Sequence, residues 1–342
     1  MSLKDRVKKV SIKDTLINNA LIIVVLIMIV YAAFNARNFV SWNNLNNVMA
    51  NISLRFIIAL GVSGILIIRG TDLSAGRVTG LASVVAGGLM QVDGAPNDLF
   101  PNIGQQHVIV GLIAAILVAM VFGLFNGLIV SYLHIPAFIA TLGTQILVYG
   151  LNLILTQSKP IGTFTNPGEG MSLFNRIGQQ GLEFGNIRIP FLFFFALVIG
   201  IFMSILYNRT KHGKYMYAIG GNEIAAEVSG VNTRITKLKI FVLGSILYGI
   251  AGFLLTAKTG STGVNAGFGY ELEAIAASTI GGVSTTGGIG TVGGVLLGVT
   301  VFELLKTTLQ FLGVEANLVF VAQGLVIIIA VALDIRKTLV KK

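Results

Sequence analysis

The fold of this chain is decided by one stretch, HVIVGLIAAILVAMVFGLFNGLIVSYL, at residues 107–133. It contains no Asp, Glu, Lys or Arg. A helix of about 20 mainly apolar residues is long enough to cross the roughly 30 Å hydrocarbon layer of a membrane. Four further stretches pass the same test, at residues 16–34, 190–207, 240–257 and 318–333. These stretches predict an integral membrane protein built from helices.

Composition agrees with this interpretation. Of the 342 residues, 54% are hydrophobic and 11% are charged, whereas soluble domains carry about 25% charged residues. Shorter or glycine-rich apolar stretches lie at residues 54–69, 75–90, 136–156, 271–283 and 291–309. We expect one all-α, polytopic membrane domain over residues 1–342. It has about ten spans, some short or broken, and eight or nine if the weaker stretches merge or re-enter.

The net charge of +10 is a topology signal. Fifteen of the 24 basic residues lie in three segments, before residue 16, within residues 208–239 and after residue 335. Cytoplasmic loops carry the Lys and Arg excess, so we expect both termini and the 208–239 loop in the cytoplasm, and no nucleic-acid partner. The first apolar run, about 19 residues long, exceeds the usual 7 to 15 of a signal peptide and predicts an anchor.

Patterns for enzymatic chemistry are weak. No Gly-x-x-x-x-Gly-Lys-Ser/Thr motif occurs, so the chain is not expected to hydrolyse ATP through a P-loop. Gly288-Ile-Gly290-Thr-Val-Gly293 fits a dinucleotide pattern literally but stands among apolar spans, where packing or a helix break explains it better. There is no cysteine, and the three histidines are far apart. We expect no catalytic residue, no cofactor and no metal site.

Glycines four residues apart recur in the apolar stretches. This spacing lets membrane helices approach closely. It favours packing within one subunit over a dedicated dimer face, although both interpretations stay open. The pairs are Gly76 with Gly80, Gly123 with Gly127, and Gly294 with Gly298.

A polar break, Arg-Gly-Thr-Asp-Leu-Ser-Ala-Gly-Arg, interrupts an apolar run at residues 69–77. Broken helices at membrane depth survive where they are packed in protein or line a wet cavity, and they mark transport pathways. If Asp72 lies at depth, Arg69 or Arg77 is the expected ion-pair partner. The alternative is a tight cytoplasmic hairpin in which the Asp72 carboxylate caps the next helix.

A second break follows in the C-terminal half, at residues 269–288, which hints at two related halves. Two glutamates open it and suit the positive N-terminal end of a half-helix, although a rim position is equally open. Uncharged polar groups inside the spans fit either a polyhydroxyl solute or helix–helix hydrogen bonds. The candidate pathway or gate residues are Asp72, Ser74, Asn126, Thr141, Glu271 and Glu273, with Thr144 beside them.

The 208–239 segment is a polar loop between two apolar spans. Asn222 is placed to cap a short helix from residue 223 to 229, and Gly230 to end it. Ala225 and Ala226 would give this helix a smooth face for a partner's groove, and contact through Glu223 and Glu227 is the alternative. A solvated loop is the simpler interpretation. The outer loop, residues 157–188, is rich in Gly and Pro and is expected to be irregular, with or without an external partner.

Several motifs resemble those of bacterial ABC-type monosaccharide permeases, the family of the ribose, xylose and galactose importers. They are Gly-Gly-Asn-Glu-Ile-Ala-Ala-Glu-Val-Ser-Gly-Val-Asn at 220–232, Gly-Thr-Asp-Leu-Ser-Ala-Gly at 70–76, Pro-Ala-Phe-Ile-Ala-Thr-Leu-Gly at 136–143, Glu-Leu-Glu-Ala-Ile-Ala-Ala at 271–277 and Gly-Gly-Val-Ser-Thr-Thr-Gly-Gly at 281–288. The likeness runs from about residue 45 to 335. Residues 56–61 and 69–77 look closest to the galactose/methyl-galactoside type.

The resemblance implies a permease homodimer in the bacterial cytoplasmic (inner) membrane, two ATP-binding domains on a sugar-type ATPase, and an external periplasmic sugar-binding protein. It also implies that residues 218–232 form the loop that couples to the ATPase. The implied coupling residues are Gly220, Gly221, Asn222, Glu223, Ala225, Ala226, Glu227 and Gly230. Three features depart from the family pattern. Arg69 stands at a position for a neutral polar residue, Glu273 replaces an Asp, and residues 157–188 align with nothing.

The sequence therefore predicts a permease that imports galactose or its methyl glycosides by alternating access, with energy from a separate ATPase. An ion-coupled secondary carrier is the alternative. It would use ionisable residues in the spans, of which Asp72, Glu303 and Lys306 are the plausible ones, and we expect no relay among them. A membrane-embedded enzyme is the third option, but it lacks a nucleophile and base at usable spacing.

Overall fold

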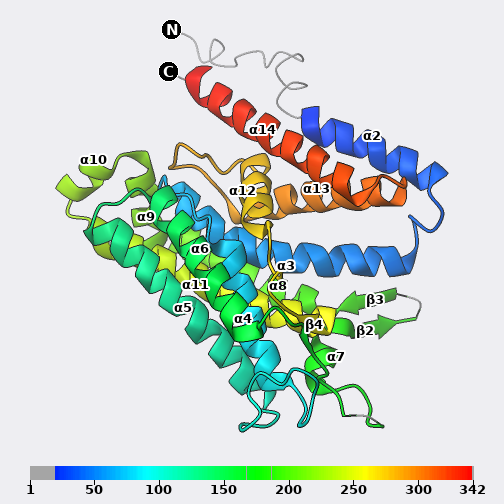
Figure 1. Cartoon of the computed structure of the whole chain (residues 1–342). Helices are drawn as coiled ribbons and strands as arrows, with labels where there is room; N and C mark the ends of the chain where they lie inside the picture. Colours follow the sequence, from blue (N-terminus) through cyan, green and yellow to red (C-terminus); the bar gives the residue numbers. More distant parts are fainter. Residues whose placement is uncertain (1–19, 167, 186, 341–342) are drawn as a thin grey trace.

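The protein is a bundle of helices (Figure 1), in a computed structural model that describes residues 20–166, 168–185 and 187–340. The helices are α2 (Ala20–Asn35), α3 (Trp42–Ile67), α4 (Ala75–Met90), α5 (Val108–Tyr132), α6 (Ala137–Thr156), α7 (Leu173–Gln179), α8 (Phe191–Arg209), α9 (Lys211–Gly221), α10 (Glu223–Val228), α11 (Thr233–Thr259), α12 (Tyr270–Ile280), α13 (Val292–Phe311) and α14 (Ala316–Val340). The predicted helical class is confirmed. The basic residues before residue 16, with Lys341 and Lys342, lie outside the described residues.

Within the described residues, every apolar stretch predicted as a span contains a helix, but not every helix can cross. In the described part of the chain, six helices are long and apolar enough, namely α3, α5, α6, α8, α11 and α13. Shorter apolar helical segments are Ile22–Asn35, Ala75–Met90 and Ala316–Ala332. The stretch predicted at 271–283 is α12, whose 11 residues reach only about 16 Å, half of a membrane. It is a half-helix, so ten full crossings are not confirmed.

Two helices form the centre of the bundle. The apolar window of α3 is 83% buried and that of α11 is 78% buried, whereas α5, α6 and α8 are each only 28% buried. The outer helices expose rows of large apolar side chains, such as Ile139 and Ile146 on α6. Lipid tails are as apolar as these side chains, so such a surface suits a membrane.

The glycine pairs lie at contacts between helices of this one chain. On α5, a Cβ at Gly123 would overlap Ser245 of α11, and one at Gly127 would overlap Leu238. On α13, a Cβ at Gly298 would overlap the carbonyl oxygen of Ala277 in α12. Close packing within the subunit is therefore confirmed for these glycines.

Both predicted breaks are present, and they meet in space. Helix α3 ends at Ile67 and α4 begins at Ala75. The connection between α12 and α13 returns to the same place, where the Gly288 amide donates to the Ile67 carbonyl oxygen at 2.8 Å. The last carbonyl groups of a helix have no hydrogen-bond donor within the helix. At the end of α3, an amide more than 200 residues away in the sequence supplies that donor.

The outer loop is more ordered than its composition predicted. It contains α7 and the antiparallel pair β2 (Gly181–Phe184) and β3 (Ile187–Pro190), and β1 (Ile161–Gly162) pairs with β4 (Ser261–Thr262). These short strands lie at the end of the bundle opposite α10 (Figure 1). The β1–β4 pair ties the outer loop to the segment that joins α11 to α12.

Candidate functional site

The predicted short helix in the polar loop is present as α10. The Asn222 side-chain oxygen accepts a hydrogen bond from the Ala225 amide at 3.0 Å, which is a standard N-cap. Gly230 has φ of 85°, the left-handed conformation that ends helices. Helix α9 precedes the cap and α11 follows the glycine. The sequence therefore located this helix to within one residue.

The face that α10 presents outward differs from the predicted one. Ala226 is 5% exposed and packs into the core, so only Ala225 of the alanine pair faces outward. Ile224 and Val228, one turn apart, are 77% and 85% exposed. The prediction of a smooth outward face made by Ala225 and Ala226 was wrong, and the exposed apolar pair on α10 is Ile224 and Val228.

The acidic residues of α10 divide between two roles. Glu223 makes an ion pair with Lys237 of α11 at 2.5 Å, which holds the helix against the bundle. Glu227 is exposed beside the apolar pair. Large apolar residues four apart in an otherwise polar loop were the signal in the sequence that could have identified Ile224 and Val228.

Arg69 joins the first helix break to the start of this loop. Its Nε donates to the Gly220 carbonyl oxygen at 2.8 Å, and its Nη2 donates to the Gly221 carbonyl oxygen at 2.6 Å. Arg69 itself has φ of 64°, a conformation that non-glycine residues adopt at a cost. Arg69, the residue that departed from the family pattern, therefore bridges the break and the end of α9.

Close backbone contacts surround this bridge. A Cβ on Gly220 would overlap the Ile67 carbonyl oxygen, and Gly288 lies against the same two segments. Gly287 and Gly288 have φ of 88° and 75°, which only glycine adopts freely. Three segments from distant parts of the chain are packed backbone to backbone here, so one cannot shift without moving the others.

Four of the predicted pathway residues come together at the helix break. The Ser74 amide and hydroxyl donate to Asp72 Oδ1 at 2.9 and 2.6 Å, and the Asn126 amide donates to the Ser74 hydroxyl at 3.0 Å. Thr144 donates to Asn126 Oδ1 at 2.6 Å. Thr141 accepts from the Leu73 amide at 3.0 Å.

These side chains are buried and occupied with one another. Asp72 is 3% exposed, Ser74 1%, Asn126 2% and Thr141 0%. In this conformation they brace the break between α3 and α4 and do not line an open pathway. The Asp72 carboxylate accepts from Ser74, the residue directly before α4, so it lies at the start of this helix as the alternative expected, while the cytoplasmic hairpin stays a prediction.

Neither arginine pairs with Asp72, contrary to prediction. Arg69 reaches Gly220 and Gly221, as described above. Arg77 donates to the Val264 carbonyl oxygen at 3.0 Å, and its guanidinium stacks 4.5 Å from the centre of the Tyr149 ring and 4.8 Å from that of Phe268. Among the described residues, Asp72 makes no ion pair.

Glu271 and Glu273 both lie in the first turn of α12, as predicted. Glu271 is 3% exposed, and its Oε1 accepts from Gln145 at 3.3 Å. Glu273 lies 2.6 Å from Arg55 Nε and 3.4 Å from Lys306 Nζ. Glu273 is therefore part of an ion-pair cluster and does not contact any open pathway.

Sequence reasoning missed this cluster. Arg55 Nε also lies 3.2 Å from Glu303 Oε2, and Asn51 donates to Glu303 Oε1 at 2.7 Å while accepting from Lys258. Glu303 and Lys306, for which no relay was expected, belong to one ion-paired network through Arg55 and Glu273. Loss of one partner from such a buried cluster would leave a charge uncompensated, and the cluster joins α3 to α12 and α13.

Known proteins resemble this chain along almost its whole length. The family described as "Branched-chain amino acid transport system / permease component" matches residues 44–331. The galactose/methyl galactoside import permease protein of Escherichia coli is 40% identical over 94% of both chains, and that of Haemophilus influenzae is 38% identical over 96% of this chain and 97% of the relative.

A second group of relatives carries another sugar in its name. The ribose import permease protein of E. coli is 31% identical over 95% of this chain and 96% of the relative. No solved structure matches the chain. The apolar helices and these relatives together identify a multi-pass protein of the inner membrane. The chain belongs to the branched-chain amino acid transport system / permease component family, within the part of that family that includes sugar import permeases.

Proposed function

We propose that this chain is the permease subunit of an ATP-driven importer for galactose or methyl galactosides. The observation that carries the proposal is the difference in identity, 34–40% to permeases named for that substrate against 31% to permeases named for ribose. An importer of ribose or a related monosaccharide is the nearest alternative substrate assignment.

The partner that supplies energy is a sugar-type ABC ATPase seated on α10. Ile224 and Val228 lie side by side on a helix at the basic end of the bundle, and an exposed apolar pair of this kind suits a partner's groove. The surrounding loop carries Arg209, Lys211 and Lys214, which favours the cytoplasmic side. On this topology both termini are cytoplasmic and about ten segments enter the membrane.

The proposed complex contains two copies of the chain and an external sugar-binding protein. The outer loop at 157–188, held by α7 and the β2–β3 pair, offers the binding protein an ordered surface at the end opposite α10. Its pairing through β1 and β4 connects that surface to the segment before α12. Docking of the binding protein on the external side and ATP binding on the cytoplasmic side would thus both act on the segments joined to α12.

Force from the ATPase passes through the Arg69 bridge. A movement of α10 displaces Gly220 and Gly221, and the two hydrogen bonds from Arg69 carry this displacement to the break between α3 and α4. The Gly288 amide on Ile67 carries it to the connection between α12 and α13. The half-helix and the two breaks are therefore the elements that would open and close the pathway.

The rival function is an ion-coupled carrier, which needs an ionisable group free to exchange its ion. Glu303, Lys306 and Glu273 are instead engaged in one cluster, and Asp72 is occupied by Ser74. The paired state of these groups favours the ATP-driven importer.

A bulky residue on the outward side of the coupling segment tests the proposal. Gly221 has open space around a Cβ, and Ala225 is exposed, so Gly221→Trp and Ala225→Trp leave the bundle itself intact. In reconstituted complex, either change should uncouple ATP hydrolysis from uptake or prevent assembly. Wild-type uptake in both variants would contradict the proposed coupling.

A further inference from the structure

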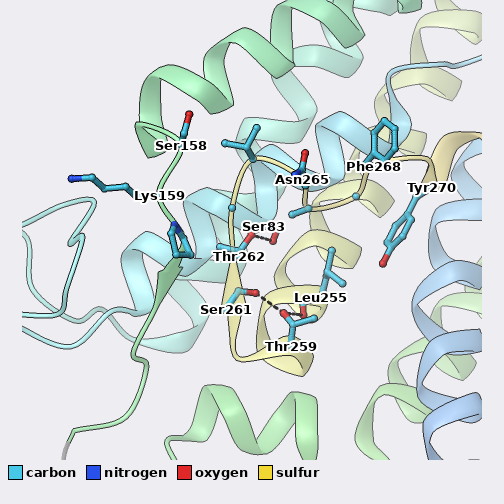
Figure 2. Close-up of a pocket in the computed structure, with 15 residues that line it drawn as sticks. Ser83, Ser158, Lys159, Leu255, Thr259, Ser261, Thr262, Asn265, Phe268 and Tyr270 are labelled. Carbon is cyan, nitrogen blue, oxygen red and sulfur yellow. Dashed lines mark hydrogen bonds between the residues drawn. The ribbon is translucent and has the colours of Figure 1, made fainter. Parts of the chain in front are cut away.

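A cavity of about 440 Å³ opens at the end of α11 farthest from α10 (Figure 2). Helix α11 has 27 residues, so this cavity lies about 40 Å from the coupling segment. Its lining comes from the end of α11 and the segment after it, from the chain after α6, from Ser83 on α4 and from Tyr270 of α12. The residues are Ser83, Ser158, Lys159, Pro160, Leu255, Thr259, Ser261, Thr262, Gly263, Val264, Asn265, Ala266, Gly267, Phe268 and Tyr270.

The segment that forms most of this lining turns back into the bundle without being helical. After β4 it runs inward along α4, where a Cβ on Gly80 would overlap the Ala266 carbonyl oxygen and one on Gly76 would overlap that of Gly267. Irregular backbone inside a membrane protein persists only where it is packed in protein or lines a watery cavity. This segment does both, with α4 on one side and the cavity on the other.

The polar groups of the lining divide into two sets. The Ser83 hydroxyl hydrogen-bonds to the Thr262 hydroxyl at 2.5 Å and to that of Thr256, behind the lining, at 2.6 Å, so Ser83 and Thr262 are occupied. The side chains of Ser158, Ser261 and Asn265 make no hydrogen bond to any residue that the structure describes, and all three are exposed. Their hydroxyl and amide groups are therefore available to a ligand.

An aromatic surface and an absence of negative charge complete the lining. Phe268 is 60% exposed although the Arg77 guanidinium stacks 4.8 Å from its ring centre, and Tyr270 follows it at the start of α12. No Asp or Glu is among the lining residues, and the one charged residue, Lys159, points away from Asn265 and Phe268 in Figure 2. A site of this size with an aromatic side chain and a few hydroxyl and amide groups suits a small neutral polar molecule.

We infer that this cavity receives the monosaccharide on the external side, with the sugar ring against Phe268 and its hydroxyls on Asn265, Ser261 and Ser158. The inference rests on the proposed function, because it takes the transported solute to be a sugar. The lack of a charged clamp keeps binding weak, so the sugar passes onward. The site lies directly before α12, the half-helix proposed to move.

The test uses the full complex of permease, ATPase and binding protein in proteoliposomes, with radiolabelled D-galactose as the probe. Phe268→Ala should lower galactose transported per ATP hydrolysed by up to about tenfold, the effect of losing one aromatic contact. The KM for galactose should not change, because the binding protein sets it. Phe320→Ala is the matched control, since Phe320 on α14 is 63% exposed and lies outside the cavity.

A second variant tests the same cavity without deleting a large side chain. The chain has no cysteine, so Asn265→Cys introduces one unique thiol. A bulky, membrane-impermeant thiol reagent added from the binding-protein side should label it and block uptake. Absence of labelling, or full labelling with unchanged uptake, would overturn the inference.

The outcomes separate this inference from the proposed function. If wild-type complex imports galactose and Phe268→Ala matches Phe320→Ala, the cavity assignment is wrong while the importer remains. If wild-type complex imports no monosaccharide, both are wrong.

Discussion

Removal of the Arg69 side chain should uncouple ATP hydrolysis from sugar import. Arg69 is the only side chain described as donating to the backbone of Gly220 and Gly221, through two hydrogen bonds of 2.8 and 2.6 Å. Arg69→Met keeps the unbranched stem of the side chain as far as the position of Nε and removes both donors. The close backbone contacts at Gly220 remain, so assembly should persist while transmission weakens.

The expected size follows from the two bonds. Each intramolecular hydrogen bond contributes about 0.5–1.5 kcal/mol net, so the pair is worth about 1–3 kcal/mol. As a coupling free energy between two sites, this would change the ratio of sugar transported to ATP hydrolysed by about 5- to 150-fold. Because Arg69 is partly exposed to water, we expect the lower part of this range, a loss of about fivefold in sugar moved per ATP.

Misfolding can be separated from uncoupling at this position. Arg69 has φ of 64°, a conformation that costs a non-glycine residue roughly 1–2 kcal/mol. Arg69→Gly removes the side chain and relieves that strain, so its stability should hold while coupling falls. Arg176→Met is the control, because Arg176 also donates to a backbone carbonyl, that of Met171, in the outer loop.

The assay measures ATP hydrolysis and galactose uptake in the same proteoliposomes. We expect Arg69→Met and Arg69→Gly to hydrolyse ATP at near the wild-type rate and to import less sugar, and the Arg176→Met ratio to match wild type. A wild-type ratio of sugar to ATP in both Arg69 variants would refute the role of the bridge.

Three further predictions concern assembly, packing and pH. Ile224→Asp and Val228→Asp should each weaken ATPase binding about 10- to 100-fold, because burying one such side chain is worth about 1.5–3 kcal/mol. Co-purification of the ATPase measures this binding, and Val40→Asp at the opposite end is the control, since Val40 is 80% exposed. Undiminished co-purification with either α10 variant would contradict the prediction. Gly298→Ala should lower the thermal unfolding midpoint in detergent, since its Cβ would overlap Ala277 at a cost of about 1–3 kcal/mol. Gly293→Ala on the same helix is the control and should leave the midpoint unchanged, because its Cβ would meet no other atom within 4 Å. Equal midpoints for the two variants would contradict the close packing at Gly298. Burial, and to a lesser extent the charge of Lys239, lower the pKa of His212 in α9. The unfolded chain therefore binds this proton more readily than the folded chain, and the stability of the protein should fall as the pH drops below about 6.5. His212→Gln should lose this part of the pH dependence, and an unchanged pH profile of the unfolding midpoint would contradict the prediction.

Local patterns in the sequence predicted local structure well. Apolar length located the helices, and Asn222 with Gly230 located α10, because a cap acts on amides two or three residues away. The glycine pairs predicted close approach for the same reason, since their effect depends on the absence of a side chain at that position. The two breaks were found because polar and glycine residues interrupt otherwise apolar runs.

Contacts between distant segments could not be predicted. Arg55 and Glu273 are 218 residues apart, and Asn51 and Glu303 are 252 apart, so nothing in either local sequence names the other. Arg69 or Arg77 was the predicted partner of Asp72 because both are close to it in sequence. A positive φ turns the chain at Arg69, however, and its guanidinium reaches Gly220. The inward face of α10 likewise depends on what the rest of the bundle packs against it.

The central claim is that import by this chain is driven by a separate ATPase. The most direct test is galactose uptake into proteoliposomes that contain the chain with or without its ATPase, with proton and sodium gradients either imposed or collapsed. We predict uptake that requires the ATPase, ATP and the binding protein, and that persists when both gradients are collapsed. Uptake by the chain alone, driven by an ion gradient, would contradict the account.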